Sequence, residues 1–368
     1  MSVTPRSQPR IHPLAIAEIR CEAPDAVAVR FAVPDALAAD YAYTAGQYLT
    51  LCRDFDGAEL RRCYSLCRRP GDPGLWIGVR EEPGGRFSGW LNGEAQVGDT
   101  VPVLTPDGRF TFTPDPNGPP RELLCVAAGS GITPVLAILE TLLADEPQSR
   151  ATLVYANRDA AHIMFRERVE DLKDRYLSRL GIFHVLSREV PEVDLLAGRF
   201  DAAKCQAFFG PNGVAPADGF DAAYLCGPEP LMDLVADSLR HHGLDAARIR
   251  RERFLNADAP APTDAAVRPP EPVPDGTEIT IIIDGRRRRF AFDPAHSSIL
   301  DAARAAGADV PYACKAGVCA TCRGLLVEGE VHIARNHALD PDELERGFIL
   351  SCQARPTTAR VVIDYDRR

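Results

Sequence analysis

Alternating apolar and polar positions dominate the first third of the chain. Between residues 11 and 118 the segments with this period are short, and one helical segment, GGRFSGWLNG (84–93), lies among them. Four of the alternating segments are GQYLTLCRD, ELRRCYSLCRR, GLWIGVREE and TVPVLTPDGRFTF. Many short strands with a single helix are typical of an antiparallel barrel. The pattern therefore predicts an antiparallel β-barrel domain over residues 11–118.

Residues 119–256 follow a different pattern. An apolar strand in RELLCVAAGSGITPVLAILETLLADE leads through a glycine-rich turn into an amphipathic helix, and ATLVYANRD then begins another strand. Strands that alternate with helices indicate an α/β domain built on a parallel sheet.

The C-terminal segment, residues 277–368, combines strands with a helix. TEITIIIDGRRRRFAFD contains two alternating runs around Asp284-Gly285, which is a strong hairpin signal. SSILDAARAAGADVPYA has helical spacing, with Ser297 or Ser298 as the cap. One strand is expected in CRGLLVEGEVHI and a last one in ARVVIDYD. These elements predict a separate α+β domain.

A proline- and alanine-rich stretch, residues 257–276, precedes this domain. ADAPAPTDAAVRPPEPVPDG has no periodic apolar pattern, so it is expected to form an extended, semi-rigid linker.

Charge and hydropathy argue against two classes of function, nucleic-acid binding and membrane insertion. The formal net charge is −10, and all of it lies before residue 277 because the last domain holds equal numbers of acidic and basic side chains. An acidic chain is not expected to bind nucleic acid, which requires a basic face. No apolar run approaches the roughly 18 residues of a membrane span. We therefore expect a cytoplasmic protein that binds neither nucleic acid nor membrane.

The 11 cysteines include a cluster with metal-ligand spacing. In a reducing compartment an odd number of cysteines indicates core thiols and ligands rather than disulfides. Cys314, Cys319 and Cys322 have the spacing C-x4-C-x2-C, and Cys352 stands alone further on. This arrangement is that of a plant-type [2Fe-2S] cluster, whereas structural zinc usually draws its ligands from two pairs. The cluster is favoured, and zinc is the alternative.

The predicted barrel carries an R-x-Y-S sequence, which indicates a flavin site only together with the motifs G-x-G-x-x-P and CGPxxM that follow it in the chain. In Arg62-Cys63-Tyr64-Ser65, strand alternation places Arg62 and Tyr64 on one side, where a guanidinium can hold a pyrophosphate and a phenol ring can pack on an isoalloxazine. Ser65 could hydrogen-bond near flavin N5. The helix that begins in GGRFS would offer amides to the flavin phosphates. Its candidate residues are Gly85, Arg86 and Ser88.

The predicted α/β domain carries two nucleotide motifs. The turn from Gly129 to Pro134 lies between a strand and a helix, where exposed helix amides can bind a pyrophosphate. Its pattern G-x-G-x-x-P resembles the nicotinamide domain of the ferredoxin-NADP reductase superfamily, and CGPEPLM resembles the CGPxxM element of that superfamily. The residues carried over are Gly129, Gly131, Thr133, Pro134, Cys226 and Gly227. Cys226 would flank the nicotinamide C4, the alternative being a small buried thiol.

The order of the motifs resembles one family over most of the chain. ELRRCYS, AAGSGITP, YACKAGVCATC and LSCQARP are similar to the reductase subunits of phenylacetyl-CoA epoxidase. The resemblance implies FAD, one [2Fe-2S] cluster in a β-grasp ferredoxin domain, NADPH, and a separate di-iron oxygenase as electron acceptor. It also suggests that Phe254 covers the flavin, although interdomain packing is an equal explanation.

Two questions of function stay open in the sequence. Arg158 and Arg166 are both placed to bind a 2′-phosphate, so NADPH is favoured and NADH is the alternative. The favoured function is an oxygenase reductase, with Ser65 and Cys226 as the residues at the site of hydride transfer. The alternatives are a reductase for a Rieske-type or desaturase-type partner and a redox sensor.

Overall fold

The computed structural model describes residues 9–254 and 273–367, and the chain divides into two compact units. One unit spans residues 11–254, and the other contains the described C-terminal residues 273–367. Most of the expected linker, residues 257–272, lies outside the described residues. The expected domain boundaries at 118/119 and 256/257 stay predictions.

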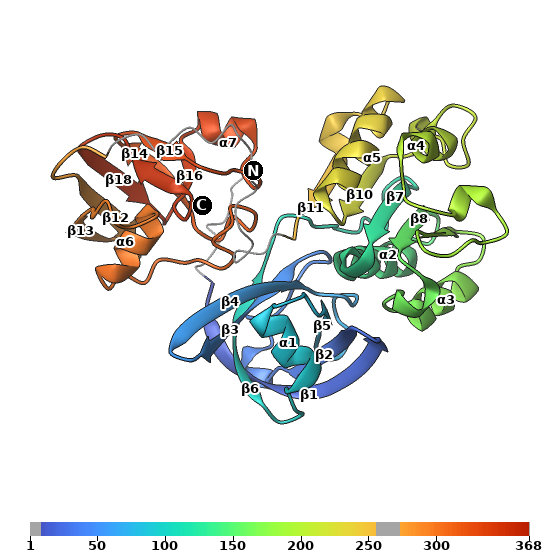
Figure 1. Cartoon of the computed structure of the whole chain (residues 1–368), viewed down its shortest axis with the longest axis horizontal. Coiled ribbons are helices and arrows are strands. Elements are labelled where there is room, and N and C mark those ends of the chain that lie inside the picture. The colour runs from blue at the N-terminus through green and yellow to red at the C-terminus, as the bar shows by residue number, and fades with distance from the viewer. Residues whose placement is uncertain (1–8, 255–272, 368) are drawn as a thin grey trace. The chain divides into compact units, whose positions relative to one another are not determined.

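The first part of unit 11–254 is an antiparallel sheet closed into a barrel (Figure 1). The strand order is β4-β3-β6-β1-β2-β5, and a bridge between Leu66 and Ile77 joins the segment after β4 to β5. Helix α1 (Arg86–Gly93) packs on β5 and β2. The strands are β1 (Ile11–Ala23), β2 (Ala26–Ala32), β3 (Tyr48–Phe55), β4 (Ala58–Ser65), β5 (Leu75–Arg80) and β6 (Thr100–Asp107). The predicted barrel is confirmed, and β1 and β2 add to the four predicted strands.

The second part of this unit is a parallel sheet with helices on both faces. The strand order is β11-β10-β7-β8-β9, and Figure 1 shows α2 and α3 on one face and α4 and α5 on the other. The strands are β7 (Glu122–Ala128), β8 (Arg150–Asn157), β9 (Leu180–Leu186), β10 (Ala222–Cys226) and β11 (Ile249–Glu252). The helices are α2 (Ile132–Asp145), α3 (Arg166–Arg175), α4 (Ala202–Phe209) and α5 (Glu229–His241). This confirms the predicted α/β fold.

Burial explains why the barrel and the parallel sheet form one unit. Alternate residues of β7 face opposite cores, with Leu123 and Cys125 on the α2 side and Leu124 and Val126 on the α5 side. Helix α2 is buried almost continuously, because barrel side chains share its core. The two domains therefore share an apolar core around α2.

The C-terminal unit has a mixed sheet with strand order β13-β12-β18-β14-β16. The pair β12 and β18 is parallel and the other pairs are antiparallel. The strands of the unit are β12 (Glu278–Ile283), β13 (Arg286–Ala291), β14 (Arg323–Glu328), β15 (Val331–Ile333), β16 (Phe348–Leu350), β17 (Ala354–Pro356) and β18 (Arg360–Asp364). Its helices are α6 (Ile299–Ala305) and α7 (Pro341–Glu345).

Local chemistry fixes several of these C-terminal elements. Asp284 and Gly285 have φ of 51° and 70°, as a two-residue hairpin turn with two left-handed residues requires. The Ser298 hydroxyl accepts a hydrogen bond from the Asp301 amide at 3.2 Å, so Ser298 is the cap of α6. The single strand expected in 322–333 is instead two strands in different sheets, because the chain turns at Gly329 (φ 85°).

No helix within residues 9–254 and 273–367 is long and apolar enough to cross a membrane.

Candidate functional site

Four cysteines come together in the C-terminal unit. Cys314, Cys319 and Cys322 lie in the loop between α6 and β14, and Cys352 follows β16. Each side chain is buried, with 9% or less of its surface exposed. The antiparallel pairing of β14 with β16 places Arg323 opposite Leu350 and thereby brings Cys322 close to the segment that carries Cys352.

The thiols are arranged as two pairs. Cys314 contacts Cys319, and Cys322 contacts Cys352. The hydrogen bond with Cys319 and burial together raise the pKa of the Cys314 thiol, and the same causes, with Cys322 as partner, raise the pKa of Cys352. Thiolates are the form that binds metal, so the positive charge of bound metal is what would deprotonate these buried thiols.

Two pairs of thiols fit a cluster with two irons better than a single zinc ion. A structural zinc ion takes four ligands around one centre. A [2Fe-2S] cluster instead takes its four thiolates as two per iron. The donor set therefore fits the cluster.

The cluster loop has an unusual backbone. Lys315, Gly317 and Ala320 have φ of 53°, 79° and 54°. At Gly317 an added Cβ would lie 2.9 Å from the Arg335 carbonyl oxygen, so this position requires glycine. The Ala316 amide donates to the Cys314 sulfur at 3.3 Å. The loop therefore turns backbone donors toward the sulfur atoms.

In the barrel, Arg62 and Tyr64 lie on β4 opposite Leu51 and Leu49 of β3. Both side chains are partly buried, and desolvation raises the pKa of the Tyr64 hydroxyl. The Tyr64 ring lies 6.0 Å from the Phe87 ring of α1. The Arg62 guanidinium donates to the Arg61 carbonyl at 2.8 Å. The structure thus places these two side chains on the same strand beside α1.

Ser65 gives the sharpest fit to a bound flavin. The residue is 2% exposed, and its hydroxyl has no hydrogen-bond partner among the described residues. A buried polar group without a partner costs free energy, so such a group usually meets a ligand or water. The hydroxyl is therefore available to a ligand at the end of β4.

At the start of α1, the side chains expected to bind phosphate already have partners within the protein. Gly85 is the N-cap residue, and the Ser88 hydroxyl accepts from the Glu82 amide at 3.1 Å and donates to the Gly85 carbonyl at 3.2 Å. Arg86 forms an ion pair with Asp56 at 2.5 Å. Phosphate binding by Gly85, Arg86 and Ser88 stays a prediction, and in this structure Ser88 stabilises the turn.

The G-x-G-x-x-P turn and the Cys226-Gly227 turn touch. An added Cβ at Gly131 would lie 2.1 Å from the Cys226 carbonyl oxygen and 3.0 Å from the Gly227 nitrogen. Gly129 has φ of 55°, in the left-handed region. Both motifs thus require glycine for close approach, and the strand ends that carry them are neighbours because β7 pairs with β10.

The start of α2 has the features of a nucleotide-binding helix end. The Thr133 hydroxyl donates to the Ser130 carbonyl at 2.9 Å, and Pro134 lies in the first turn, where a missing N–H costs nothing. Cys226 is 1% exposed, and desolvation raises the pKa of its thiol well above the usual value. The thiol is therefore neutral at the edge of this site.

The expected 2′-phosphate ligands already have partners. Arg158 donates to Asp25 at 2.9 Å, and Arg166 pairs with Glu170 at 2.8 Å. Asp25 lies in the turn between β1 and β2, so Arg158 joins the parallel-sheet domain to the barrel. Phe254 lies just after β11 and is 42% exposed. The roles expected for Arg158, Arg166 and Phe254 stay predictions.

The sequence interpretation missed Arg80. This residue ends β5 and donates to the His162 carbonyl at 2.6 Å. Its Nη1 atom lies 3.3 Å from the position that a Cβ at Gly129 would take, so the guanidinium borders the glycine turn. Only the basic residue at the end of a predicted strand signalled it in the sequence.

Comparison with known proteins agrees with this geometry. Residues 13–112 match the oxidoreductase FAD-binding domain, 125–237 the oxidoreductase NAD-binding domain, and 281–357 the 2Fe-2S iron-sulfur cluster binding domain. The predicted cofactors FAD, nicotinamide nucleotide and [2Fe-2S] cluster are thereby confirmed. The match to a cluster-binding domain contradicts the zinc alternative.

Three similar proteins cover nearly the whole chain. The chain is 42% identical to a component of 1,2-phenylacetyl-CoA epoxidase from Escherichia coli (strain K12), over 97% of this chain and 98% of that protein. It is 34% identical to the ferredoxin reductase component of 3-ketosteroid-9-alpha-monooxygenase of Rhodococcus rhodochrous, over 96% of each. The structure of phthalate dioxygenase reductase matches with a TM-score of 0.57 at 26% identity, covering 96% of this chain and 98% of that chain.

Proposed function

Because the chain belongs to the reductase family that includes the Escherichia coli phenylacetyl-CoA epoxidase component, we propose that it reduces the oxygenase component of a phenylacetyl-CoA epoxidase. The observation that carries this proposal is the 42% identity to that relative over 97% of this chain. The chain is an NAD(P)H-dependent oxidoreductase with FAD-binding, NAD-binding and [2Fe-2S]-binding domains.

The three domains suit the conversion of a two-electron donor to a one-electron carrier. A nicotinamide donates two electrons at once as a hydride, whereas a [2Fe-2S] cluster accepts one electron at a time. A flavin bound between them can accept the hydride and release its electrons singly. On the protein side, the Ser65 hydroxyl is free to hydrogen-bond to the flavin ring, and the Arg62 guanidinium and the Tyr64 ring would hold it on β4. Positioning of this kind is the main requirement of hydride transfer.

The nicotinamide side would be held by the two touching turns. Gly129, Gly131 and Thr133 present the start of α2 to a pyrophosphate, and Cys226 and Gly227 limit the space beyond it. The position of the buried Cys226 thiol at the end of β10, where its backbone approaches Gly131, supports a role beside the nicotinamide.

We also propose that NADPH is the preferred donor, with Arg158 as the 2′-phosphate ligand. Arg158 lies directly after β8, and its ion pair with Asp25 would be exchanged for the phosphate. Replacing Arg158 by Ala should lower the NADPH/NADH ratio of kcat/KM at least tenfold, whereas Asp25→Asn should raise it. Arg240→Ala, at an exposed position of α5 in the same domain, is the matched control. An unchanged ratio in Arg158→Ala would remove Arg158 from the NADPH site.

The test of the whole function is an anaerobic titration of the purified protein with NADPH, together with iron and flavin analysis. We expect loss of flavin absorbance, partial bleaching of the cluster band and about two irons per chain. Turnover with ferricyanide then separates a reductase from a redox sensor, because a sensor needs no rapid hydride path. A protein that binds its cofactors but gives no NADPH-driven turnover would contradict the proposal.

The acceptor needs a separate test. A di-iron oxygenase component of phenylacetyl-CoA epoxidase should accelerate NADPH oxidation in the presence of its substrate. The 34% identity to a reductase of 3-ketosteroid-9-alpha-monooxygenase favours a different oxygenase as the second candidate, including the Rieske type expected from the sequence. Stimulation by that oxygenase alone would assign the second candidate and leave the electron path intact. A cytoplasmic location stays a prediction.

A further inference from the structure

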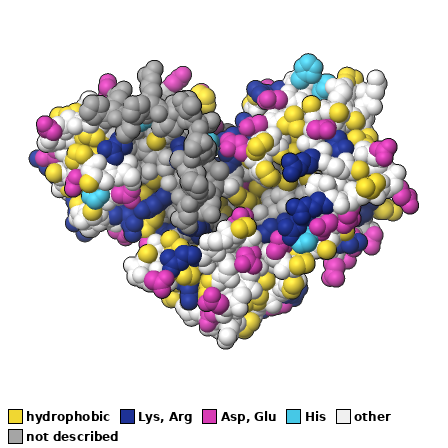
Figure 2. Space-filling model, in the orientation of Figure 1, with side chains coloured by type: hydrophobic (Ala, Val, Ile, Leu, Met, Phe, Trp, Pro, Cys, Tyr) yellow, Lys and Arg dark blue, Asp and Glu magenta, His cyan; other side chains and the backbone are white. Residues whose placement is uncertain are grey.

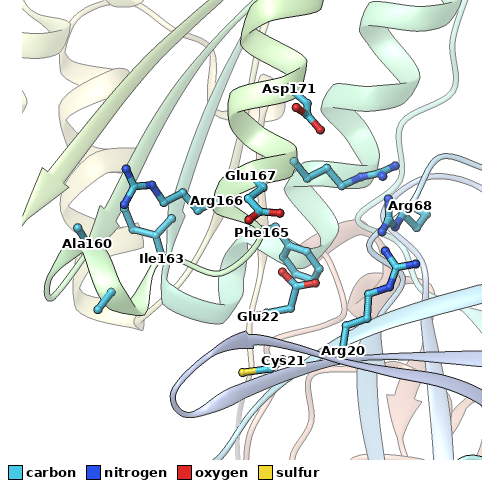
Figure 3. Close-up of a pocket in the computed structure, with 12 residues that line it drawn as sticks. Arg20, Cys21, Glu22, Arg68, Ala160, Ile163, Phe165, Arg166, Glu167 and Asp171 are labelled. Atoms are coloured by element: carbon cyan, nitrogen blue, oxygen red, sulfur yellow. The ribbon is translucent and has the colours of Figure 1, made fainter.

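A cavity of ≈ 460 Å³ lies where the barrel meets the parallel-sheet domain. Figure 3 shows Arg20, Glu22 and Arg68 on the barrel side, with Glu22 next to Phe165 of the other domain, whereas the Arg166 side chain extends away from them. Its volume is within the range of small-molecule sites. Neither the Gly129–Pro134 turn nor the Cys226-Gly227 turn lines this cavity, so it is separate from the two turns proposed to hold the nicotinamide nucleotide. Arg166, one of the two arginines expected to bind the 2′-phosphate, does line it.

Arg68 is the unusual member of the lining. Only 8% of its surface is exposed, and its Nε atom is buried without a hydrogen-bond partner among the described residues. Its guanidinium lies over the Trp76 ring at 5.0 Å and forms no ion pair within 4.0 Å in the described part of the chain. A buried guanidinium without a direct ion pair is costly, and the carboxyls of Glu140 and Glu22 attract Arg68 only from beyond that distance.

The other three arginines of the cavity already have carboxylate partners. Figure 2 shows basic side chains beside acidic ones on the visible face of the protein. The pairs are Arg20 with Glu18, Arg166 with Glu170, and Arg168 with Glu140. The Glu22 carboxyl attracts Arg68 electrostatically but is hydrogen-bonded to the Phe165 backbone. Among the described residues, Arg68 is therefore the arginine of this lining that has no direct ion pair.

The remaining walls indicate what kind of anion fits. Ile163 and Phe165 lie on the side of the parallel-sheet domain, and because both are almost fully buried, each offers only a small apolar face to the cavity. Glu22, Glu167 and Asp171 also line the cavity, and their negative charges disfavour a doubly charged phosphate more than a singly charged carboxylate. A planar carboxylate also matches the two-pronged donor geometry of a guanidinium.

We propose that this cavity binds an organic monocarboxylate, with the carboxylate on Arg68 and the apolar body against Ile163 and Phe165. The occupant would touch both the barrel and the parallel-sheet domain. Bound there, it would stabilise their packed arrangement by its own binding free energy.

The direct test is calorimetric titration of the full-length holoprotein with benzoate as probe. We expect saturable binding to the wild type and at least tenfold weaker binding to Arg68→Met. Arg360→Met, which removes an exposed arginine of the C-terminal unit, is the matched control and should bind like the wild type. Equal affinity of wild type and Arg68→Met would overturn the proposal, as would absence of saturation up to roughly 10 mM benzoate. Tighter binding of inorganic phosphate than of benzoate would overturn the carboxylate assignment.

A second measurement does not depend on the folding of Arg68→Met. Cys21 lines the cavity and is exposed, so its alkylation by N-ethylmaleimide can be followed by peptide mass spectrometry in the wild-type protein. Benzoate should slow the alkylation of Cys21 several-fold and leave that of the partly buried Cys63 unchanged. Ala161→Trp, at an exposed position of the lining, should abolish benzoate binding with Arg68 in place. Unaltered labelling of Cys21 together with full binding by Ala161→Trp would refute the site.

Discussion

Removal of the Gln353 side-chain amide should lower the reduction potential of the [2Fe-2S] cluster. Gln353 follows the fourth cysteine, and its Nε2 atom lies 2.8 Å from the Lys315 carbonyl oxygen and 3.7 Å from the Cys352 sulfur. A carbonyl can only accept, so the contact with Lys315 fixes which end of the amide faces the cluster loop. The second N–H of the same group is then directed to the sulfur.

The size of the effect follows from the charge that the cluster gains. Reduction adds an electron to the iron-thiolate unit, so a hydrogen bond to sulfur stabilises the reduced form more than the oxidised form. A hydrogen bond to a charged group contributes about 1.5–3 kcal/mol, and we take about 1 kcal/mol as the differential share of this long contact. Since a tenfold change in a one-electron equilibrium corresponds to about 59 mV, the expected decrease is about 40 mV.

The assay is a redox titration of the holoprotein followed by electron paramagnetic resonance. Gln353→Leu keeps the volume of the side chain and removes both donors. Gln206→Leu makes the same substitution at an exposed position of α4 in the other unit and should leave the potential unchanged. Gln353→Glu should lower the potential further, because a carboxylate near the sulfur repels the added electron.

A potential of Gln353→Leu within roughly 10 mV of the wild type, with the cluster intact, would refute this reasoning. The signal shape distinguishes loss of the hydrogen bond from distortion of the loop. Unchanged g values with a lower potential assign the shift to the hydrogen bond, whereas altered g values would mean that Gln353 acts by anchoring the Lys315 carbonyl.

Three further predictions concern unit 11–254. Ser65→Ala should leave the free energy of unfolding within about 0.5 kcal/mol, because the hydroxyl has no partner in the described structure, but should slow flavin reduction about tenfold in stopped-flow assays. Gly131→Ala should cost about 1–3 kcal/mol of stability and weaken nucleotide binding, since its Cβ would lie 2.1 Å from the Cys226 oxygen; an unchanged Tm would contradict the close approach. Desolvation and the charge of Arg166 lower the pKa of His184 in the folded state below its usual value of 6.5. As the pH decreases below about 7, the unfolded state therefore takes up a proton on this histidine more readily than the folded state does, and the free energy of unfolding decreases. His184→Phe should flatten this decrease in urea unfolding at pH 7.5 and 5.5.

The sequence predicts local elements where short-range chemistry decides them. Asp284-Gly285 forms the expected hairpin turn, and Ser298 caps α6. Strand β1 was not predicted because its alternation is interrupted, with register shifts in its pairing with β2 between Ile16 and Glu18 and between Cys21 and Ala23. A bulge adds a residue to one strand and thereby breaks the period of two on which the prediction depends.

Contacts between distant segments were beyond the sequence patterns. Gly131 and Cys226 belong to separate motifs, and only the strand order, with β10 beside β7, brings their backbones together. Arg158 was assigned to a phosphate because it follows a strand, but the turn of another domain supplies Asp25 as its partner. The same limit applies to Arg68, which lines a cavity together with residues of both domains.

Sheet register explains why three clustered cysteines and one distant cysteine can form a single site. Cys322 immediately precedes β14, and the pairing of Arg323 with Leu350 fixes where β16 ends relative to it. The chain continues past Ser351, whose amide donates to the Cys322 carbonyl at 3.2 Å, and this bond holds the next residue, Cys352, beside Cys322. A shift of one residue in this register would turn the neighbouring side chains to the opposite face. Whether Cys352 reaches the other three cysteines therefore depends on the number of residues between the Arg323–Leu350 pair and Cys352, and not on the distance in sequence between Cys322 and Cys352.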